Sequence, residues 1–120
     1  MKLRIKGNSI RLRLLRSEVE RFAAEGSISD AVRFGETTLR YSLSMSSDAG
    51  SIQSKFENGE ILVIIPENTG RDWANGDDVG LETEQPIRNG ETLSILIEKD
   101  FVCIGRPDDP DRHDAFPVAV

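Results

Sequence analysis

The first 16 residues of the chain carry six basic side chains and no acidic one. In an extended strand alternate side chains point to the same face, so bases at every second position gather on one side. Guanidinium and ammonium groups held together in this way bind carboxylate or phosphate through charge-assisted hydrogen bonds. The sequence therefore predicts an anion-binding face, and its candidate residues are Lys2, Arg4, Arg11 and Arg13.

A second charged cluster, Glu98-Lys99-Asp100, interrupts an otherwise apolar stretch between Leu93 and Ile104. In a strand, Glu98 and Asp100 point to one face and Lys99 to the other. The two carboxylates have two interpretations: they hold Mg²⁺ or share acid–base work, or they neutralise the basic N-terminal face. We favour neutralisation, so we expect the basic face to be covered either by these acids or by an anionic ligand.

The familiar catalytic motifs are missing: there is no G-x-x-x-x-G-K-[ST] phosphate loop, no G-x-G-x-x-G fingerprint and no G-x-S-x-G elbow. The single cysteine, Cys103, lies in an apolar run and is expected to be a buried thiol. The single histidine, His113, is expected to be exposed without a role, and the single tryptophan, Trp73, is expected in the core. We therefore expect no catalytic residue, no metal and no cofactor; enzymatic activity stays an open question that leans towards none.

Residues 1–14 have the alternation of a β-hairpin around Gly7-Asn8, and glycine at the first central position suits a type II′ turn. Like charges directly opposite one another destabilise a hairpin unless an anionic group covers them. The register that follows pairs Ile5 with Ile10 and Leu3 with Leu12 on an apolar face, and Arg4 with Arg11 and Lys2 with Arg13 on a basic face.

The rest of the chain predicts one short helix and a series of strands. Ser17 as N-cap and Glu20 three residues later form a capping box, which starts a helix over about 17–25. Alternating residues predict strands around 38–45, and asparagine–glycine pairs predict tight turns between later strands. These turns lie at Asn58-Gly59 and Asn89-Gly90, and the run 61–65, apolar on both faces, is expected to be a central strand.

These elements amount to seven or eight strands with no βαβ alternation and no internal repeat. The expected fold is α+β, dominated by antiparallel sheet that can curl into a half-barrel. A length of 120 residues fits one domain, which we place at 1–104. Residues 105–120 hold three of the five prolines and are expected to form an acidic, partly ordered tail that docks through Phe116.

The composition excludes several classes of protein. The chain holds 15 basic and 21 acidic residues, a formal net charge of −6, which does not suit general coating of nucleic acid. No apolar run approaches the roughly 20 residues that span a bilayer, and the charged N-terminus does not fit a signal peptide. With one cysteine there is no intramolecular disulfide, so a cytoplasmic location without a membrane partner is expected.

Several phrases together resemble an uncharacterised family of small bacterial proteins of about this length. They are Leu3-Arg4-Ile5-Lys6-Gly7-Asn8-Ser9, Trp73-Ala74 followed by Val79-Gly80-Leu81, Ile97-Glu98-Lys99-Asp100-Phe101, and Asp114-Ala115-Phe116-Pro117. The resemblance covers nearly the whole chain and implies a bacterial cytosolic single domain. It carries no activity, substrate or catalytic residue.

Residues 1–26 also resemble the swapped-hairpin domain of transition-state regulators and some antitoxins. The match rests on a basic strand, Gly7-Asn8-Ser9, an alternating strand and a short helix. This resemblance implies a DNA-binding dimer in which Arg4, Lys6, Arg11 and Arg13 contact phosphates. The end of the second strand, Leu14-Leu15-Arg16, lacks the proline often seen there, and a further long stretch of sheet follows.

Three hypotheses for the function follow. The leading one is a non-enzymatic binding or interaction domain, monomeric or homodimeric, whose basic face meets an acidic partner surface or the acids of its own chain. The first alternative is a DNA-binding or antitoxin-like regulator that uses the same hairpin. The second is an enzyme for a phosphate-type substrate, with Arg4, Arg11 and Arg13 gripping the anion and Glu98 or Asp100 holding Mg²⁺.

Overall fold

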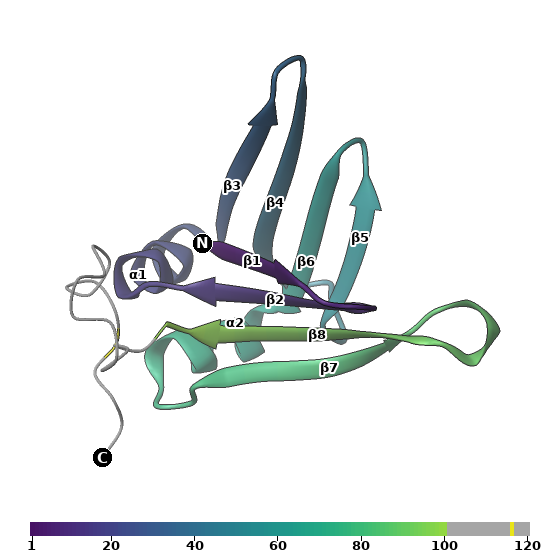
Figure 1. The fold of residues 1–120 in the computed structure, drawn as a ribbon. Helices are drawn as coiled ribbons and strands as arrows, with labels where there is room; N and C mark the ends of the chain where they lie inside the picture. Colours follow the sequence, from purple (N-terminus) through teal and green to yellow (C-terminus); the bar gives the residue numbers. More distant parts are fainter. Residues whose placement is uncertain (101–115, 117–120) are drawn as a thin grey trace, which may run out of the picture.

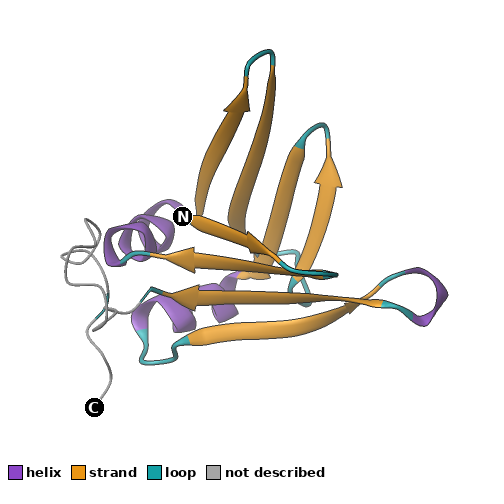
Figure 2. Ribbon diagram, in the orientation of Figure 1, coloured by secondary structure: helices purple, strands orange, loops and turns teal. Residues whose placement is uncertain are grey.

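The computed structural model describes residues 1–100 and Phe116. The apolar residues 101–104, with the thiol of Cys103, lie outside the described residues. So do His113 and the rest of the tail apart from Phe116. Eight strands and two helices, with one short 3-10 turn, make up the described part (Figures 1 and 2). In chain order they are β1 (Lys2–Ile5), β2 (Ser9–Leu14), α1 (Arg16–Glu25), β3 (Ser27–Phe34), β4 (Thr37–Ser46), β5 (Gln53–Glu57), β6 (Glu60–Pro66), α2 (Glu67–Asn75), β7 (Gly80–Pro86), η1 (Arg88–Gly90) and β8 (Thr92–Lys99).

The strands form two four-stranded sheets that cross each other (Figure 1). The first sheet has the order β1-β2-β8-β7 and the second the order β3-β4-β6-β5. In each sheet two antiparallel hairpins meet at a parallel central pair, β2 with β8 and β4 with β6. The α+β class and the mainly antiparallel pairing are as predicted, and two separate sheets replace the curled half-barrel because each helix carries the chain from one sheet to the other.

The N-terminal hairpin has the predicted register. Leu3 lies opposite Leu12, Ile5 opposite Ile10, Lys2 opposite Arg13 and Arg4 opposite Arg11. Gly7 in the turn has a φ of 55°, a conformation that glycine adopts without the steric cost of a side chain. Leu12 on the apolar face of the hairpin is fully buried in the core, whereas Ile5 near the turn is 60% exposed.

Helix α1 begins at Arg16 with Leu15 as its N-cap, so the predicted capping box at Ser17 and Glu20 is wrong by two residues. The acid that caps the helix is Glu18, which accepts a hydrogen bond from the backbone N–H of Leu15 at 2.9 Å. The helix starts early because β2 ends in the buried Leu14 and the chain turns directly after it.

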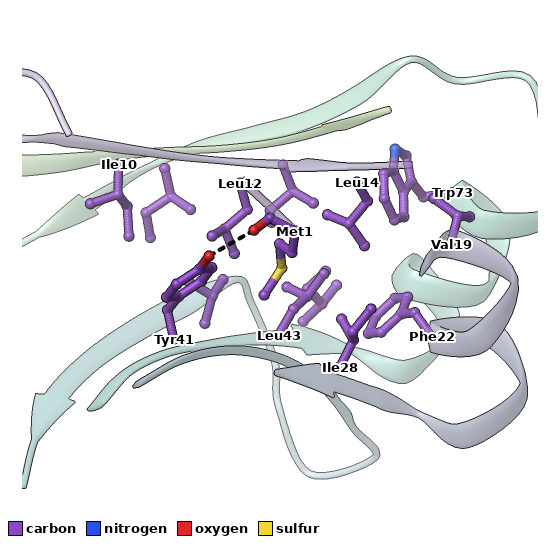
Figure 3. Packing of buried hydrophobic residues seen from close by; sticks show 14 residues of the cluster. Met1, Ile10, Leu12, Leu14, Val19, Phe22, Ile28, Tyr41, Leu43 and Trp73 are labelled. Carbon is purple, nitrogen blue, oxygen red and sulfur yellow. Dashed lines mark hydrogen bonds between the residues drawn. The ribbon is translucent and has the colours of Figure 1, made fainter. Parts of the chain in front are cut away.

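The core lies between the two sheets and the helices (Figure 3). Trp73 is 1% exposed, as predicted for the only tryptophan, and packs edge-on against Phe22 with ring centroids 6.2 Å apart. The hydroxyl of Tyr41 donates a hydrogen bond of 2.8 Å to the carbonyl oxygen of Met1. This bond ties β4 of the second sheet to the start of the first.

The chain consists of two units with the same order of elements, β1-β2-α1-β3-β4 and β5-β6-α2-β7-β8. The units exchange hairpins, so each sheet takes one hairpin from each unit. Phe22 and Trp73 occupy the same position in their helices, counted from the first helical residue, and so do Val19 and Gly70. The expectation of no internal repeat is wrong for the fold, because the same order of elements occurs twice. The sequence hides this repeat, since equivalent positions share little more than their apolar character.

Candidate functional site

The predicted basic residues lie together on the outer face of the first sheet. We call the outward side of β1 and β2, with Lys2, Arg4, Lys6, Arg11 and Arg13, the basic face. These side chains alternate with Leu3, Leu12 and Leu14, which point into the core. The parallel pairing of β2 with β8 then places Glu98 directly beside Arg13.

Glu98 neutralises one part of the basic face. Its Oε1 atom lies 2.9 Å from Nε and 2.8 Å from Nη2 of Arg13. The same oxygen lies 3.6 Å from Nε of Arg11, which is therefore the weaker of the two contacts. The sequence suggested Glu98 as a neutralising acid but not the base that it pairs with, because the pairing of β2 with β8 joins residues from opposite ends of the described chain.

Asp100 neutralises the neighbouring end of the face. Its Oδ2 atom lies 3.0 Å from Nζ of Lys2, and its backbone N–H donates to the carbonyl oxygen of Leu14 at 2.8 Å. The side chain of Lys2 is about half exposed, so this ion pair contributes about 1 kcal/mol or less. Glu98 and Asp100 therefore share a face, as predicted, and each pairs with a base.

The unmatched positive charge lies nearer the hairpin turn. Arg4 is exposed and sits directly opposite Arg11. Within residues 1–100 neither Arg4 nor Lys6 forms an ion pair, while Arg11 has only the 3.6 Å contact with Glu98. Two guanidinium groups opposite each other on neighbouring strands repel, so this part of the face favours an anionic partner.

Lys99 does not belong to this face. It is 6% exposed, and its Nζ donates to the carbonyl oxygen of Gly76 at 2.9 Å. The same Nζ lies 5.7 Å from the ring centroid of Trp73 and 5.6 Å from that of Phe116, distances that suit cation–π contact. Burial lowers the pKa of Lys99, while the charges of Asp77 and Asp78 act in the opposite direction.

An acidic strip, which sequence reasoning missed, lies on the far side of the same outer face. Glu82 and Glu84 of β7 are both exposed, and Glu84 accepts hydrogen bonds from the hydroxyls of Ser94 at 2.8 Å and Thr92 at 3.1 Å. An open hollow of about 280 Å³ lies between this strip and Arg11. The available signal was the alternation of Glu82 and Glu84 with less polar neighbours, typical of a strand with one solvated side.

A second open hollow, of about 370 Å³, lies on the second sheet. Its lining mixes bases with acids, Arg40 and Lys55 with Glu57 and Glu60. Ser42 donates a hydrogen bond of 3.1 Å to Glu60. This hollow therefore lacks the excess of positive charge that marks the basic face.

The described part of the chain contains no helix long and apolar enough to cross a membrane. The resemblance of residues 1–26 to swapped-hairpin regulators is not confirmed, since β2 pairs with β8 of its own chain in a four-stranded sheet. No curated protein and no solved structure matches the chain. Residues 1–119 match one family, described as a family of unknown function (DUF7009). The near-full-length resemblance is thereby confirmed, and the chain belongs to this family of unknown function.

Proposed function

We propose that this chain is a non-enzymatic binding domain whose basic face receives an acidic protein surface. The observation that carries the proposal is the pair Arg4 and Arg11, opposed on neighbouring strands with almost no compensating charge. Within residues 1–100, Asp100 and Glu98 cover Lys2 and Arg13, and Arg11 has only the 3.6 Å contact with Glu98. An acidic partner supplies the carboxylates that the turn-proximal part of the face lacks.

The distribution of charge favours a protein partner over duplex DNA. Within residues 1–100, three bases of the basic face have no close ion pair and remain for an external anion: Arg4, Lys6 and Arg11, the last lying 3.6 Å from Glu98. DNA-binding proteins commonly neutralise about 6–10 phosphates. Glu82 and Glu84 on the same outer face would also repel a phosphate backbone running across it.

A direct test measures binding of fluorescein-labelled poly-L-glutamate by fluorescence anisotropy. The wild-type chain is expected to bind this probe, with affinity that falls as salt rises, because exposed charges are screened. The Arg4→Glu/Arg11→Glu variant should bind at least about tenfold more weakly, since two charge contacts are each reversed. A labelled duplex DNA serves as the competing probe.

The matched control is Arg40→Glu/Lys55→Glu, which makes the same change of net charge on the second sheet. It should retain the affinity of the wild type within about twofold, because net charge alone acts weakly at a distance. Equal loss in both double variants, or no binding by the wild type at about 50 mM salt, rules the proposal out. Tighter binding of duplex DNA than of poly-glutamate would replace it with the DNA-binding alternative.

A further inference from the structure

We infer that the acidic surface received by the basic face is the same outer face of a second copy of this chain. The inference rests on the proposed function and names its partner. Its basis is that the outer face of the first sheet is basic along β1 and β2 and acidic along β7. A face with this division of charge is complementary to itself.

The complementarity is clearest along one row of residues that crosses all four strands. The row runs Arg4, Arg11, Leu96, Glu82, from β1 through β2 and β8 to β7. When a second copy faces it with the row reversed, Arg4 meets Glu82 and Arg11 meets Leu96, and the reciprocal contacts follow by symmetry. Both ends of the row are then matched by opposite charge.

The neighbouring row shows the same pattern. Ser9, Ser94 and Glu84 lie side by side on β2, β8 and β7, and Lys6 lies opposite Ser9 through two backbone hydrogen bonds. Reversal places Lys6 over Glu84 of the second copy. The hydroxyls of Ser94 and Thr92 hold the carboxylate of Glu84 on this face of the sheet.

Only one symmetric arrangement satisfies these contacts. A two-fold axis parallel to the strands, lying between the two faces, reverses every row and sets β1 over β7 of the second copy. An axis across the strands would set β1 over β1 and bring Arg4 against Arg4. Opposite charges therefore select the first arrangement, an isologous dimer in which each contact occurs twice.

The distance between strands allows Arg4 to contact Glu82 of a second copy but not Glu82 of its own chain. β1 and β7 are separated by three strand intervals, about 14 Å, so Arg4 and Glu82 of one chain do not reach each other. Stacked sheets lie about 10 Å apart, a gap that an arginine and a glutamate reaching towards each other can bridge. Within residues 1–100 neither side chain has an ion-pair partner.

The test uses charge reversal in both strips and measures mass by light scattering after size exclusion. At about 100 μM and low salt the wild type is expected to be a dimer that dissociates as salt rises. Arg4→Glu/Arg11→Glu sets an acid against Glu82 of the second copy, and Glu82→Arg sets a base against Arg4 of the second copy, so each variant alone should be monomeric. All three residues are on the surface, and the far-UV circular dichroism and Trp73 fluorescence of both variants should match the wild type.

The decisive step is to mix the two variants. In the mixture the acid introduced at position 4 of one variant faces the base introduced at position 82 of the other, and Arg4 still faces Glu82 at the reciprocal contact. Lys6 and Glu84 are unchanged in both variants, so the mixture should form a one-to-one heterodimer of the wild-type mass. A wild-type chain that stays monomeric, or variants that dimerise alone, overturns the inference; the latter result would move the interface to another surface. A mixture that fails to associate overturns it as well.

The two proposals fail in different ways. A monomeric wild type that binds poly-glutamate through Arg4 and Arg11 removes the dimer and leaves the proposed function in place. Unaltered poly-glutamate binding by Arg4→Glu/Arg11→Glu removes the proposed function, whatever the oligomeric state. The Arg40→Glu/Lys55→Glu control should remain a dimer, because it leaves the first sheet unchanged.

Discussion

The buried hydroxyl of Tyr41 links the two sheets, and this link depends on the hydroxyl remaining protonated. It donates to the carbonyl oxygen of Met1 at 2.8 Å. Burial raises the pKa of Tyr41, and the negative charges of Asp30 and Glu18 raise it further. Deprotonation would leave a buried phenolate facing a carbonyl oxygen, so the folded state favours the neutral form.

The first prediction concerns this titration, which is readily observed because Tyr41 is the only tyrosine. Tyrosinate absorbance of the folded chain should rise at a pH above the ordinary value of 10.0, and that of the urea-unfolded chain at that value. The stabilisation is therefore complete below pH 10.0 and is lost as the pH rises through the folded-state pKa. Tyr41→Phe should lose about 1 kcal/mol of unfolding free energy at neutral pH. Coincident titrations of the folded and unfolded chain would contradict the assignment.

Residue patterns in the sequence predicted which side chains share a face but not which ones pair. The alternation of Lys2, Arg4, Arg11 and Arg13 with leucine and isoleucine fixes their common side of the hairpin. The partner of Arg13 depends on the parallel contact of β2 with β8, which no local pattern encodes. Lys99 lies between two acids in the sequence, but the alternation of side chains along a strand places it on the opposite face from Glu98 and Asp100.

Helix α2 shows how an element can lack the signal that usually identifies it. Where α1 has Val19 and Phe22 on its buried side, α2 has Gly70 and Trp73. A glycine in place of an apolar residue removes the helical period from the sequence, so the pattern does not predict α2. In the fold, Met45 of β4 packs where a side chain of Gly70 would extend.

The second prediction tests this packing. A Cβ atom at Gly70 would lie 3.1 Å from Cγ of Met45, a flexible side chain that gives way to one methyl group. Gly70→Ala should therefore change stability by less than about 1 kcal/mol, because the improved helix propensity offsets the contact. Gly70→Val adds branched bulk and should cost about 1–3 kcal/mol in urea unfolding followed by Trp73 fluorescence. Equal stability of the valine variant and the wild type would show that the site is not closely packed.

The exchange of hairpins makes each half of the molecule dependent on the other. The first unit supplies β1-β2 to one sheet and β3-β4 to the other, and the central pairs β2-β8 and β4-β6 join the units. Neither unit contains a complete sheet. A two-stranded hairpin is at most marginally stable alone, so separate units lack the partners that bury their apolar faces.

The third prediction follows from this dependence. A protease site inserted between Ala49 and Gly50, in the loop that joins β4 to β5, should yield a cut protein that stays folded. After separation in denaturant, each fragment alone should be largely unstructured by circular dichroism. Remixing should restore native Trp73 fluorescence. Native fluorescence from the second fragment by itself would show that the units fold independently.

For the molecule as a whole, the sequence predicted the α+β class of the fold but not the symmetry between its two halves. Alternation and turn residues indicated the hairpins, including those at Asn58 and Asn89, both of which have positive φ. The order of hairpins within the sheets depends on long-range pairing that leaves no local trace. Equivalent residues such as Leu14 and Ile65, or Phe22 and Trp73, differ enough to hide the repeat.

The duplicated architecture allows the basic face to be compared with its equivalent in the other half of the molecule. A chain of half this length, exchanging hairpins with an identical copy, would bury the same core as a symmetric pair of molecules. In a single chain the two halves can differ in sequence. Arg11 and Arg13 of β2 stand where β6 has Leu62 and Ile64, so the charge of the basic face breaks the two-fold symmetry of the fold.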